Sequence, residues 1–173
     1  MDKVCFGVDI GGTSIKIGLF GLSIGTSMVF DGKLIENWSF KTRKTTYAKD
    51  VLKDIAESIN EKIEKFKLSN DKIIGIGVGI PGPILDDGEV LQLPNMGEGR
   101  FNLVKELHQL TGFKVRAAND ANIAALGEQW QGSGKGFSDV VLVTLGTGVG
   151  GGIILKNDIL SGNNGAAGEI GHM

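Results

Sequence analysis

The sequence predicts an α/β fold with a mixed sheet, followed by the beginning of a second unit of the same kind. Three strand-like runs joined by short turns open the chain, and these hairpins exclude a plain doubly wound parallel sheet. Helix-like and strand-like segments then alternate, which is typical of parallel strands. After a linker rich in Gly and Ser at residues 132–138, strand-like runs resume as if a second copy were starting.

The opening strands are short apolar runs bounded by turn residues. Val4–Ile10 predicts a buried strand, and Gly11-Gly12 predicts a tight turn into a second strand over Ser14–Phe20. A small and polar loop at Gly21–Ser27 and a turn at Asp31-Gly32 are expected to lead into a third strand over Lys33–Phe40.

The first helix is expected over Tyr47–Leu68, because apolar residues recur there at spacings of three and four. This spacing places them on one face of a helix, with Asp and Lys on a solvated opposite face. The apolar positions are Val51, Leu52, Ile55, Ile59, Ile63 and Phe66.

The remaining elements follow from the same kinds of signal. Ile73–Ile80 alternates Ile or Val with Gly, which predicts a strand that another backbone approaches closely. Gly112 is placed to end a helix over Leu103–Leu110, and either Asn119 or Asp120 can cap a helix that runs to about Trp130. Further strands are expected at Val115–Ala118, Asp139–Leu145, Gly151–Leu155 and Ile159-Leu160, with a loop at Asp86-Asp87-Gly88 and a hairpin turn at Lys156-Asn157-Asp158.

Composition and charge narrow the class of protein. With 41% hydrophobic and 22% charged residues, the 173-residue chain has the balance of a folded globular protein rather than a disordered one. Its net charge of −2 predicts neither a nucleic-acid partner nor an anionic membrane partner. Cys5 is the only cysteine, no apolar run approaches the ~20 residues of a membrane span, and no apolar leader opens the chain. A reducing, cytoplasmic location is the expectation.

Two glycine-rich turns could bind phosphate. Gly11 to Thr13 and Gly146 to Gly152 each follow a predicted strand, and glycine lets successive N–H groups turn toward phosphate oxygens. Asp9 lies where a cation bridging phosphates needs a carboxylate, and Lys16 is near enough in sequence to reach the same space. The alternative for each turn is an ordinary hairpin connection.

Two G-x-G-x-x-G matches, at Gly77–Gly82 and Gly146–Gly151, suggest dinucleotide binding at first sight. Neither opens a helix, because Pro83 follows the first and an apolar run follows the second, so this interpretation lacks its structural context. Gly134-Lys135 is not followed by Ser or Thr and therefore does not form a Walker loop.

Asp120 is the candidate catalytic carboxylate, because it falls at a strand-to-helix junction where it could accept a proton from a substrate hydroxyl. Its alternative role is capping of the helix. Glu169 and His172 lie three residues apart and would share a face if helical, where they could bind sugar hydroxyls or, for His172, a metal. His108, between leucines on a helix, is expected to be structural.

In this order, the segments resemble the ROK family of sugar kinases, within the actin-like (ribonuclease H-like) ATPase-domain superfamily. Each segment is short, but six in sequence span nearly the whole chain. They are Asp9–Gly18 (DIGGTSIKIG), Gly77–Pro83 (GVGIPGP), Pro94-Asn95, Asn119–Glu128 (NDANIAALGE), Thr144–Gly152 (TLGTGVGGG) and Gly165–Met173 (GAAGEIGHM).

The resemblance implies an ATP-dependent hexose kinase, most similar to bacterial glucokinases, with a cleft between two domains. Asp120 would take the proton from the sugar 6-hydroxyl, and Asp9 would help to hold Mg²⁺. The residues implied to bind ATP phosphates are Gly11, Gly12, Thr13, Gly146, Thr147 and Gly148, and those implied to bind sugar hydroxyls are Asn95, Asn119, Glu169 and His172. The alternative within the family is a sugar-binding module or the remnant of a transcriptional regulator.

The resemblance also implies an incomplete enzyme. We expect an N-terminal actin-like domain over residues 1–118 and the start of a larger domain over residues 119–173. In the family, the histidine that corresponds to His172 binds a structural Zn²⁺ together with a cysteine cluster that follows it. The zinc site of this chain would lack those cysteines. This chain alone is therefore expected to be inactive, and its uncovered strands favour a homo-oligomer. Gly21–Val29 is expected to be an insertion relative to the family.

Overall fold

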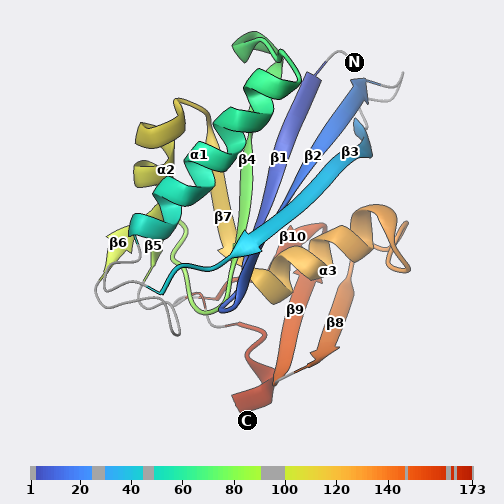
Figure 1. The fold of residues 1–173 in the computed structure, drawn as a ribbon. Coiled ribbons are helices and arrows are strands. Elements are labelled where there is room, and N and C mark those ends of the chain that lie inside the picture. Colours follow the sequence, from blue (N-terminus) through green and yellow to red (C-terminus); the bar gives the residue numbers. More distant parts are fainter. Residues whose placement is uncertain are drawn as a thin grey trace.

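The computed structural model describes residues 3–24, 30–44, 49–90, 100–146, 148–162, 165 and 167–172. Over these residues, the chain forms a five-stranded sheet, a three-stranded sheet, a two-stranded ribbon and three α-helices (Figure 1). The predicted α/β fold with a mixed sheet is confirmed. Among the helices of the described ranges, none has the length and apolar character needed to cross a membrane.

The five-stranded sheet combines an antiparallel hairpin region with parallel strands. Its order is β3 (Phe30–Lys41), β2 (Ser14–Ile24), β1 (Lys3–Ile10), β4 (Ile73–Ile80) and β7 (Val115–Asn119). β2 pairs antiparallel with both β1 and β3, whereas β4 pairs in parallel with both β1 and β7. The parallel strands end at one edge of the sheet, so Asp9 and Asn119 come to the same side of the molecule.

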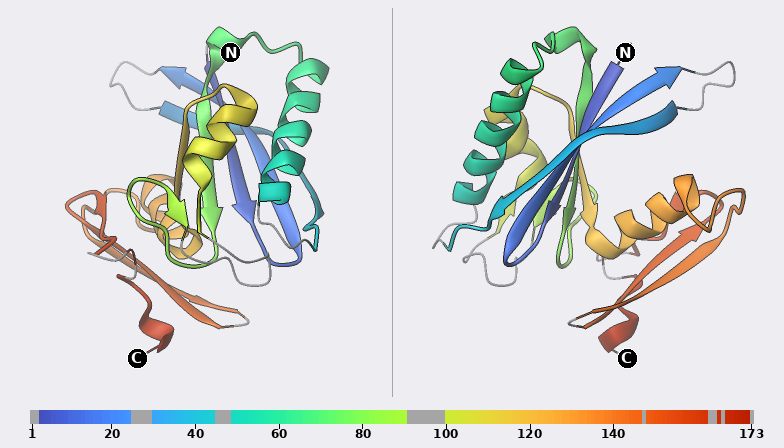
Figure 2. Two further views of the ribbon diagram at one scale, coloured as in Figure 1. Left: turned by 90° about the vertical axis from the view of Figure 1, so that its left-hand side faces the viewer. Right: turned by 45° about the vertical axis from the view of Figure 1, so that its right-hand side comes forward.

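Helices α1 (Lys49–Lys65) and α2 (Leu103–Thr111) cover one face of this sheet (Figure 2). The predicted apolar stripe of α1 packs into the core, with Val51, Leu52, Ile55 and Ile59 buried. α2 begins with Asn102, whose side-chain oxygen accepts a hydrogen bond from the Lys105 N–H. It ends at Gly112 in the left-handed conformation, as predicted.

The hairpin of β2 and β3 is longer than expected. The sequence predicted a loop from Gly21 and a turn at Asp31-Gly32, and both predictions are wrong for the described residues. β2 continues to Ile24, and Gly21 to Ile24 pair with Phe30 to Lys33. Backbone hydrogen bonds between the strands stabilise this extension, so small and polar side chains do not interrupt it. Residues 25–29 lie outside the described part.

Two local boundaries also differ from the predictions. α1 ends at Lys65 rather than Leu68, because Lys67 adopts a positive φ of 49° that a helix cannot continue. Phe66 is therefore outside the helix and is exposed. The ribbon of β5 (Glu89–Val90) and β6 (Phe101–Asn102) was not predicted, because strands of two residues show no periodicity. A short 3₁₀ turn, η1 (Asn70–Lys72), precedes β4.

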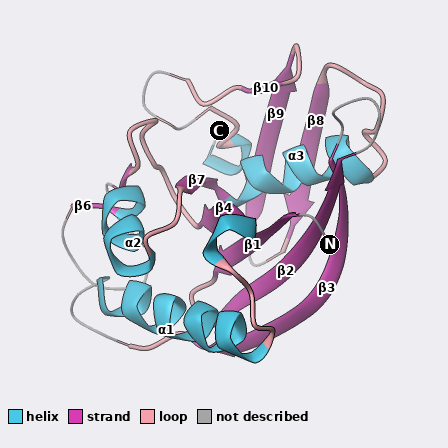
Figure 3. Cartoon of the chain, turned by 90° about the horizontal axis from the view of Figure 1, so that it is seen from above, coloured by secondary structure: helices cyan, strands magenta, loops and turns pink. Residues whose placement is uncertain are grey.

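A second region follows β7. It contains α3 (Asp120–Gln131), β8 (Val140–Leu145), β9 (Val149–Leu155), β10 (Asp158–Ile159) and the 3₁₀ turn η2 (Ile170–His172). α3 lies along one face of the β8–β9 hairpin (Figure 3). The approach is close, because an ideal Cβ on Gly152 would lie 2.4 Å from the Ala121 carbonyl oxygen. The predicted turn before β10 is confirmed, with Lys156 and Asn157 both at positive φ.

Candidate functional site

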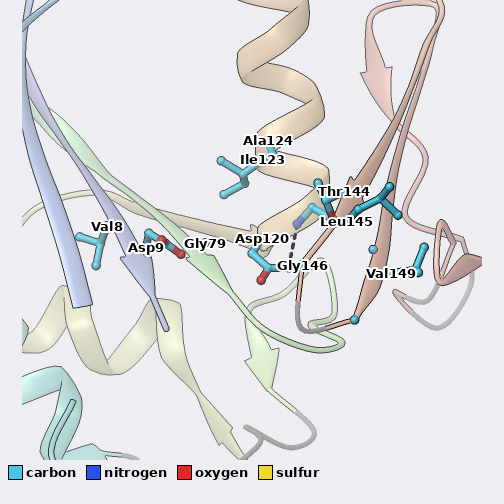
Figure 4. Close-up of a pocket in the computed structure, with 13 residues that line it drawn as sticks. Val8, Asp9, Gly79, Asp120, Ile123, Ala124, Thr144, Leu145, Gly146 and Val149 are labelled. Atoms are coloured by element: carbon cyan, nitrogen blue, oxygen red, sulfur yellow. Dashed lines mark hydrogen bonds between the residues drawn. The ribbon is translucent and has the colours of Figure 1, made fainter. Parts of the chain in front are cut away.

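A cleft of about 600 Å³ opens where the ends of β1 and β4 face the turn between β8 and β9 (Figure 4). It lies between the first sheet and the second region, with α3 at its base. Its polar lining comes from two carboxylates, one threonine and several glycines: Asp9, Asp120, Thr144, Gly79, Gly146, Gly148 and Gly150. The structure thus brings together two motifs that are more than a hundred residues apart in the sequence.

Asp9 and Lys16 face each other across the first hairpin. They are paired in the register of β1 and β2, and the Lys16 Nζ lies 3.4 Å from the Asp9 Oδ2. Both side chains are more than half exposed, so this ion pair contributes little to stability. It leaves the Asp9 carboxylate open to the cleft, and the predicted proximity of Lys16 is confirmed.

The turn between β1 and β2 contains one glycine that the fold requires and one that it does not. Gly11 donates its N–H to the Ser14 carbonyl at 3.0 Å, and a Cβ there would lie 2.7 Å from that oxygen. A Cβ on Gly12 would meet nothing within 4 Å. The N–H groups of Gly12 and Thr13 have no backbone partner among the described residues. These two donors, rather than that of Gly11, are available to a ligand.

The turn between β8 and β9 has the same character. The Gly146 N–H donates to the Gly148 carbonyl at 2.9 Å, and a Cβ on either glycine would meet nothing within 4 Å. Neither glycine has the left-handed backbone that favours this residue. These glycines therefore contribute a backbone without side chains that faces the cleft, which allows phosphate oxygens to approach closely. Thr147, predicted with them, lies outside the described residues.

At the start of α3, one residue caps the helix and the next presents a carboxylate to the cleft. The Asn119 side-chain oxygen accepts hydrogen bonds from the N–H groups of Ala121, at 2.9 Å, and Asn122, at 3.2 Å. Asn119 is thus the helix cap, and its Nδ2 lies 3.4 Å from the Gly82 carbonyl. The Asp120 Oδ1 accepts a further bond from the Ala121 N–H at 2.7 Å, while the carboxylate faces the cleft. The sequence left the two residues as alternative caps; the structure assigns capping to Asn119.

The environment of Asp120 raises the pKa of its carboxyl group. The main cause is loss of contact with water, and the negative charges of Asp9 and Glu169 raise the pKa further. The hydrogen bond from the Ala121 N–H acts in the opposite direction. A carboxylate with a raised pKa is a better proton acceptor than an ordinary one, which suits a general base.

Of the other predicted sugar-binding residues, the structure describes Glu169 but neither Asn95 nor the side chain of His172. Glu169 lies just before η2 and is close enough to act on Asp120 through its charge. Its segment is held against β9, since a Cβ on Gly151 would lie 2.4 Å from the Gly168 carbonyl. His172 belongs to η2, but its side chain is outside the described part, as is Asn95. The structure therefore unites Asn119, Asp120 and Glu169. His108, predicted to be structural, holds the Phe113 carbonyl with its Nδ1 at 2.7 Å.

One residue near the site was not found from the sequence. Thr42 follows β3, and its hydroxyl donates to the Gly11 carbonyl at 2.6 Å while its N–H donates to the Thr13 carbonyl at 3.1 Å. No motif marks this residue, which lies 31 positions from Gly11. Only the pairing of β2 with β3 brings it to the turn.

The cleft fits Mg²⁺ bound with a nucleotide better than it fits zinc. Mg²⁺ takes one or two carboxylates together with phosphate oxygens and water, and Asp9, whose side chain is half exposed, lines the cleft. The facing carboxylates concentrate negative charge that a cation would neutralise. Over the described residues, no three His, Cys, Asp or Glu side chains gather as metal ligands, so a zinc site with His172 stays a prediction.

Comparison with known proteins identifies the family. The pattern of the ROK family matches residues 5–173. The chain belongs to the ROK family. It is 40% identical over 173 residues to a glucokinase of Halalkalibacterium halodurans, covering 99% of this chain and 50% of that protein. It is 34% identical to an N-acetyl-D-glucosamine kinase of Yersinia enterocolitica, covering 96% of this chain and 51% of the relative. This ROK chain thus spans about half the length of these relatives.

Solved ROK structures share the fold. A ROK glucokinase from Streptomyces griseus, in complex with glucose and AMPPNP, superimposes with a TM-score of 0.79 at 33% identity. The match covers 98% of this chain and 50% of that one. A ROK family transcriptional regulator, a homologue of the E. coli MLC protein, has a TM-score of 0.82 at 25% identity, over 97% of this chain and 40% of the regulator. The mixed sheet of this chain is that of the actin-like ATPase fold.

Proposed function

We propose that the protein to which this chain belongs is an ATP-dependent hexose kinase, with glucose as its substrate and glucose 6-phosphate as its product. One observation carries the proposal. Asp120, on a helix that Asn119 caps, faces with a raised pKa a cleft that is lined by Asp9 on one side and by the bare backbone of Gly146 and Gly148 on the other. A base on one side and phosphate-binding backbone on the other are what phosphoryl transfer to a hydroxyl requires.

In the proposed reaction, the Asp120 carboxylate accepts the proton of the sugar 6-hydroxyl. The hydroxyl oxygen forms a bond to the γ-phosphorus of ATP, the bond from that phosphorus to the β-γ bridging oxygen breaks, and ADP leaves. Gly12 and Thr13 on one turn and Gly148 on the other, with Thr147 as a prediction, would position the phosphates through backbone N–H groups. Mg²⁺, held with the help of Asp9, would neutralise phosphate charge when bound.

Two arguments support glucose as the sugar: the polar residues beside Asp120 and the names of the relatives in the ROK family. Asn119, Glu169 and, as predictions, Asn95 and His172 would bind hydroxyl groups beside Asp120. The relatives act on glucose or on N-acetyl-D-glucosamine, according to their names, and the glucokinase has the higher identity to this chain. The regulator of similar fold supports a second candidate, a sugar-binding module without catalysis.

We also propose a division into domains at residues 1–118 and 119–173. The buried core cluster is composed of residues between Val4 and Val115. Ala121 and Ala125 of α3 and Ile154 of β9 are buried outside that cluster. The cleft then lies between the two domains. We propose a cytoplasmic location for the kinase as well.

A chimeric kinase tests the activity. Residues 1–173 are joined to the half of the H. halodurans glucokinase that the alignment leaves uncovered, and ADP release with glucose is measured. Asp120→Asn should lower kcat by about 10²-fold or more while glucose affinity changes little, because a general base acts in the transition state. Asp71→Asn, an exposed carboxylate on η1, is the matched control and should leave kcat unchanged. Retention of more than about 5% of kcat by Asp120→Asn would remove Asp120 from this role, since general-base loss costs far more.

A further inference from the structure

Thr42 fastens the end of β3 to the turn between β1 and β2 by two hydrogen bonds. Its backbone N–H donates to the Thr13 carbonyl at 3.1 Å, and its hydroxyl donates to the Gly11 carbonyl at 2.6 Å. The first bond continues the ladder, because Lys41 pairs with Ser14. The second is a side-chain bond and therefore depends on the identity of residue 42.

The hydroxyl bond determines where the Gly12 N–H points. The Gly11 carbonyl and the Gly12 N–H belong to one planar trans peptide, so they point in opposite directions. A carbonyl held on the Thr42 side therefore directs the Gly12 N–H away from Thr42. In the same way, the Thr13 carbonyl fixes the peptide that follows it.

Little else restrains this peptide. Gly12 has no side chain, and nothing described lies within 4 Å of the position where its Cβ would be. The Gly12 N–H has no backbone partner among the described residues, whereas the Gly11 N–H is held by Ser14. A peptide between two glycines has a large conformational freedom, which binding of a ligand would have to remove.

We infer that Thr42 is a positioning residue, which aims the Gly12 N–H at a bound phosphate by holding the opposite end of the same peptide. The inference rests on the proposed function. Thr42 itself lies behind the turn and acts through Gly11, so it contributes to nucleotide affinity rather than to the chemical step. The hydroxyl is the required group, and serine can supply it whereas valine, with the same shape, cannot.

The test uses the 173-residue chain, with MgADP as the probe and three variants. In Thr42→Val, the backbone order parameter of the Gly12 N–H should fall from about 0.85 to below about 0.6, the range of flexible backbone. MgADP affinity should weaken about five- to tenfold, the effect of one neutral hydrogen bond. Thr42→Ser should restore both values, and Thr42→Ala should repeat the effect of valine with a smaller side chain.

Two outcomes would overturn the inference. One is an unchanged order parameter at Gly12 in Thr42→Val and Thr42→Ala; the other is a mobile Gly12 with unchanged MgADP affinity. A general loss of structure would also move the amide signals of the core strand β4, whereas the positioning role leaves them in place. If the unaltered chain binds no MgADP, the order parameter decides whether Thr42 holds the turn, the affinity comparison is made in the chimeric kinase, and the activity of that chimera decides the proposed function.

Discussion

The two hairpins that border the cleft, β1–β2 and β8–β9, share one local plan but differ in what packs around them. Each consists of a strand, a glycine turn and a returning strand, and the cleft is lined by Asp9 of the first hairpin and by Gly146 and Gly148 of the second. On β1, every second side chain from Val4 to Ile10 is buried. On β8, Val141, Val143 and Leu145 are 66%, 50% and 83% exposed, and no residue of the strand is buried.

The difference arises from neighbours that lie far away in the sequence. β1 is flanked by β2 and β4, and its sheet is covered by α1 and α2 (Figure 2). β8 is an edge strand, paired with β9 alone among the described strands. α3 covers one face of that hairpin, and the opposite face is approached near Gly151 by the segment around Gly168. One wall of the cleft is therefore supported by its own core, while the other depends mainly on α3.

The largest effect expected from this difference is self-association. We propose that the apolar edge strand β8 pairs with a second copy of the chain, because unpaired N–H and C=O groups beside exposed apolar side chains favour strand addition. Val143→Lys should shift the chain from dimer to monomer, as measured by light scattering. Leu34→Lys, on the exposed edge strand β3, is the control and should change nothing. A monomeric unaltered chain would contradict the proposal.

A smaller effect concerns the pH dependence of the chimeric kinase. Asp9 comes from the first wall and Glu169 from the second, and both raise the pKa of Asp120. The base must be deprotonated, so kcat should fall as pH decreases through this raised pKa. Glu169→Gln removes one negative neighbour, which lowers the pKa of Asp120 and should move the acid limb of the kcat profile to lower pH. An acid limb that stays in place or moves to higher pH would show that Glu169 does not act on the base.

Much of the first region could be predicted from the sequence, because its signals are local. The apolar stripe of α1 and the Gly112 cap each lie within a few residues of the element that they define. The extension of the β2–β3 hairpin and the role of Thr42 could not be predicted, since both depend on which strands pair. The choice between Asn119 and Asp120 as cap was open for a different reason. Both side chains can accept the same N–H, and only backbone geometry decides between them.

The most direct test of the unequal walls is amide hydrogen exchange of the 173-residue chain, with and without MgADP. Without nucleotide, amides of β1 and β4 should exchange slowest and those of β8 should exchange much faster, because only the first set is enclosed by a core. MgADP should slow exchange at residues 148–150 and along β8, while β1 and β4 change little. Equal protection of β1 and β8 without nucleotide, or no slowing of the second wall at saturating MgADP, would contradict the account.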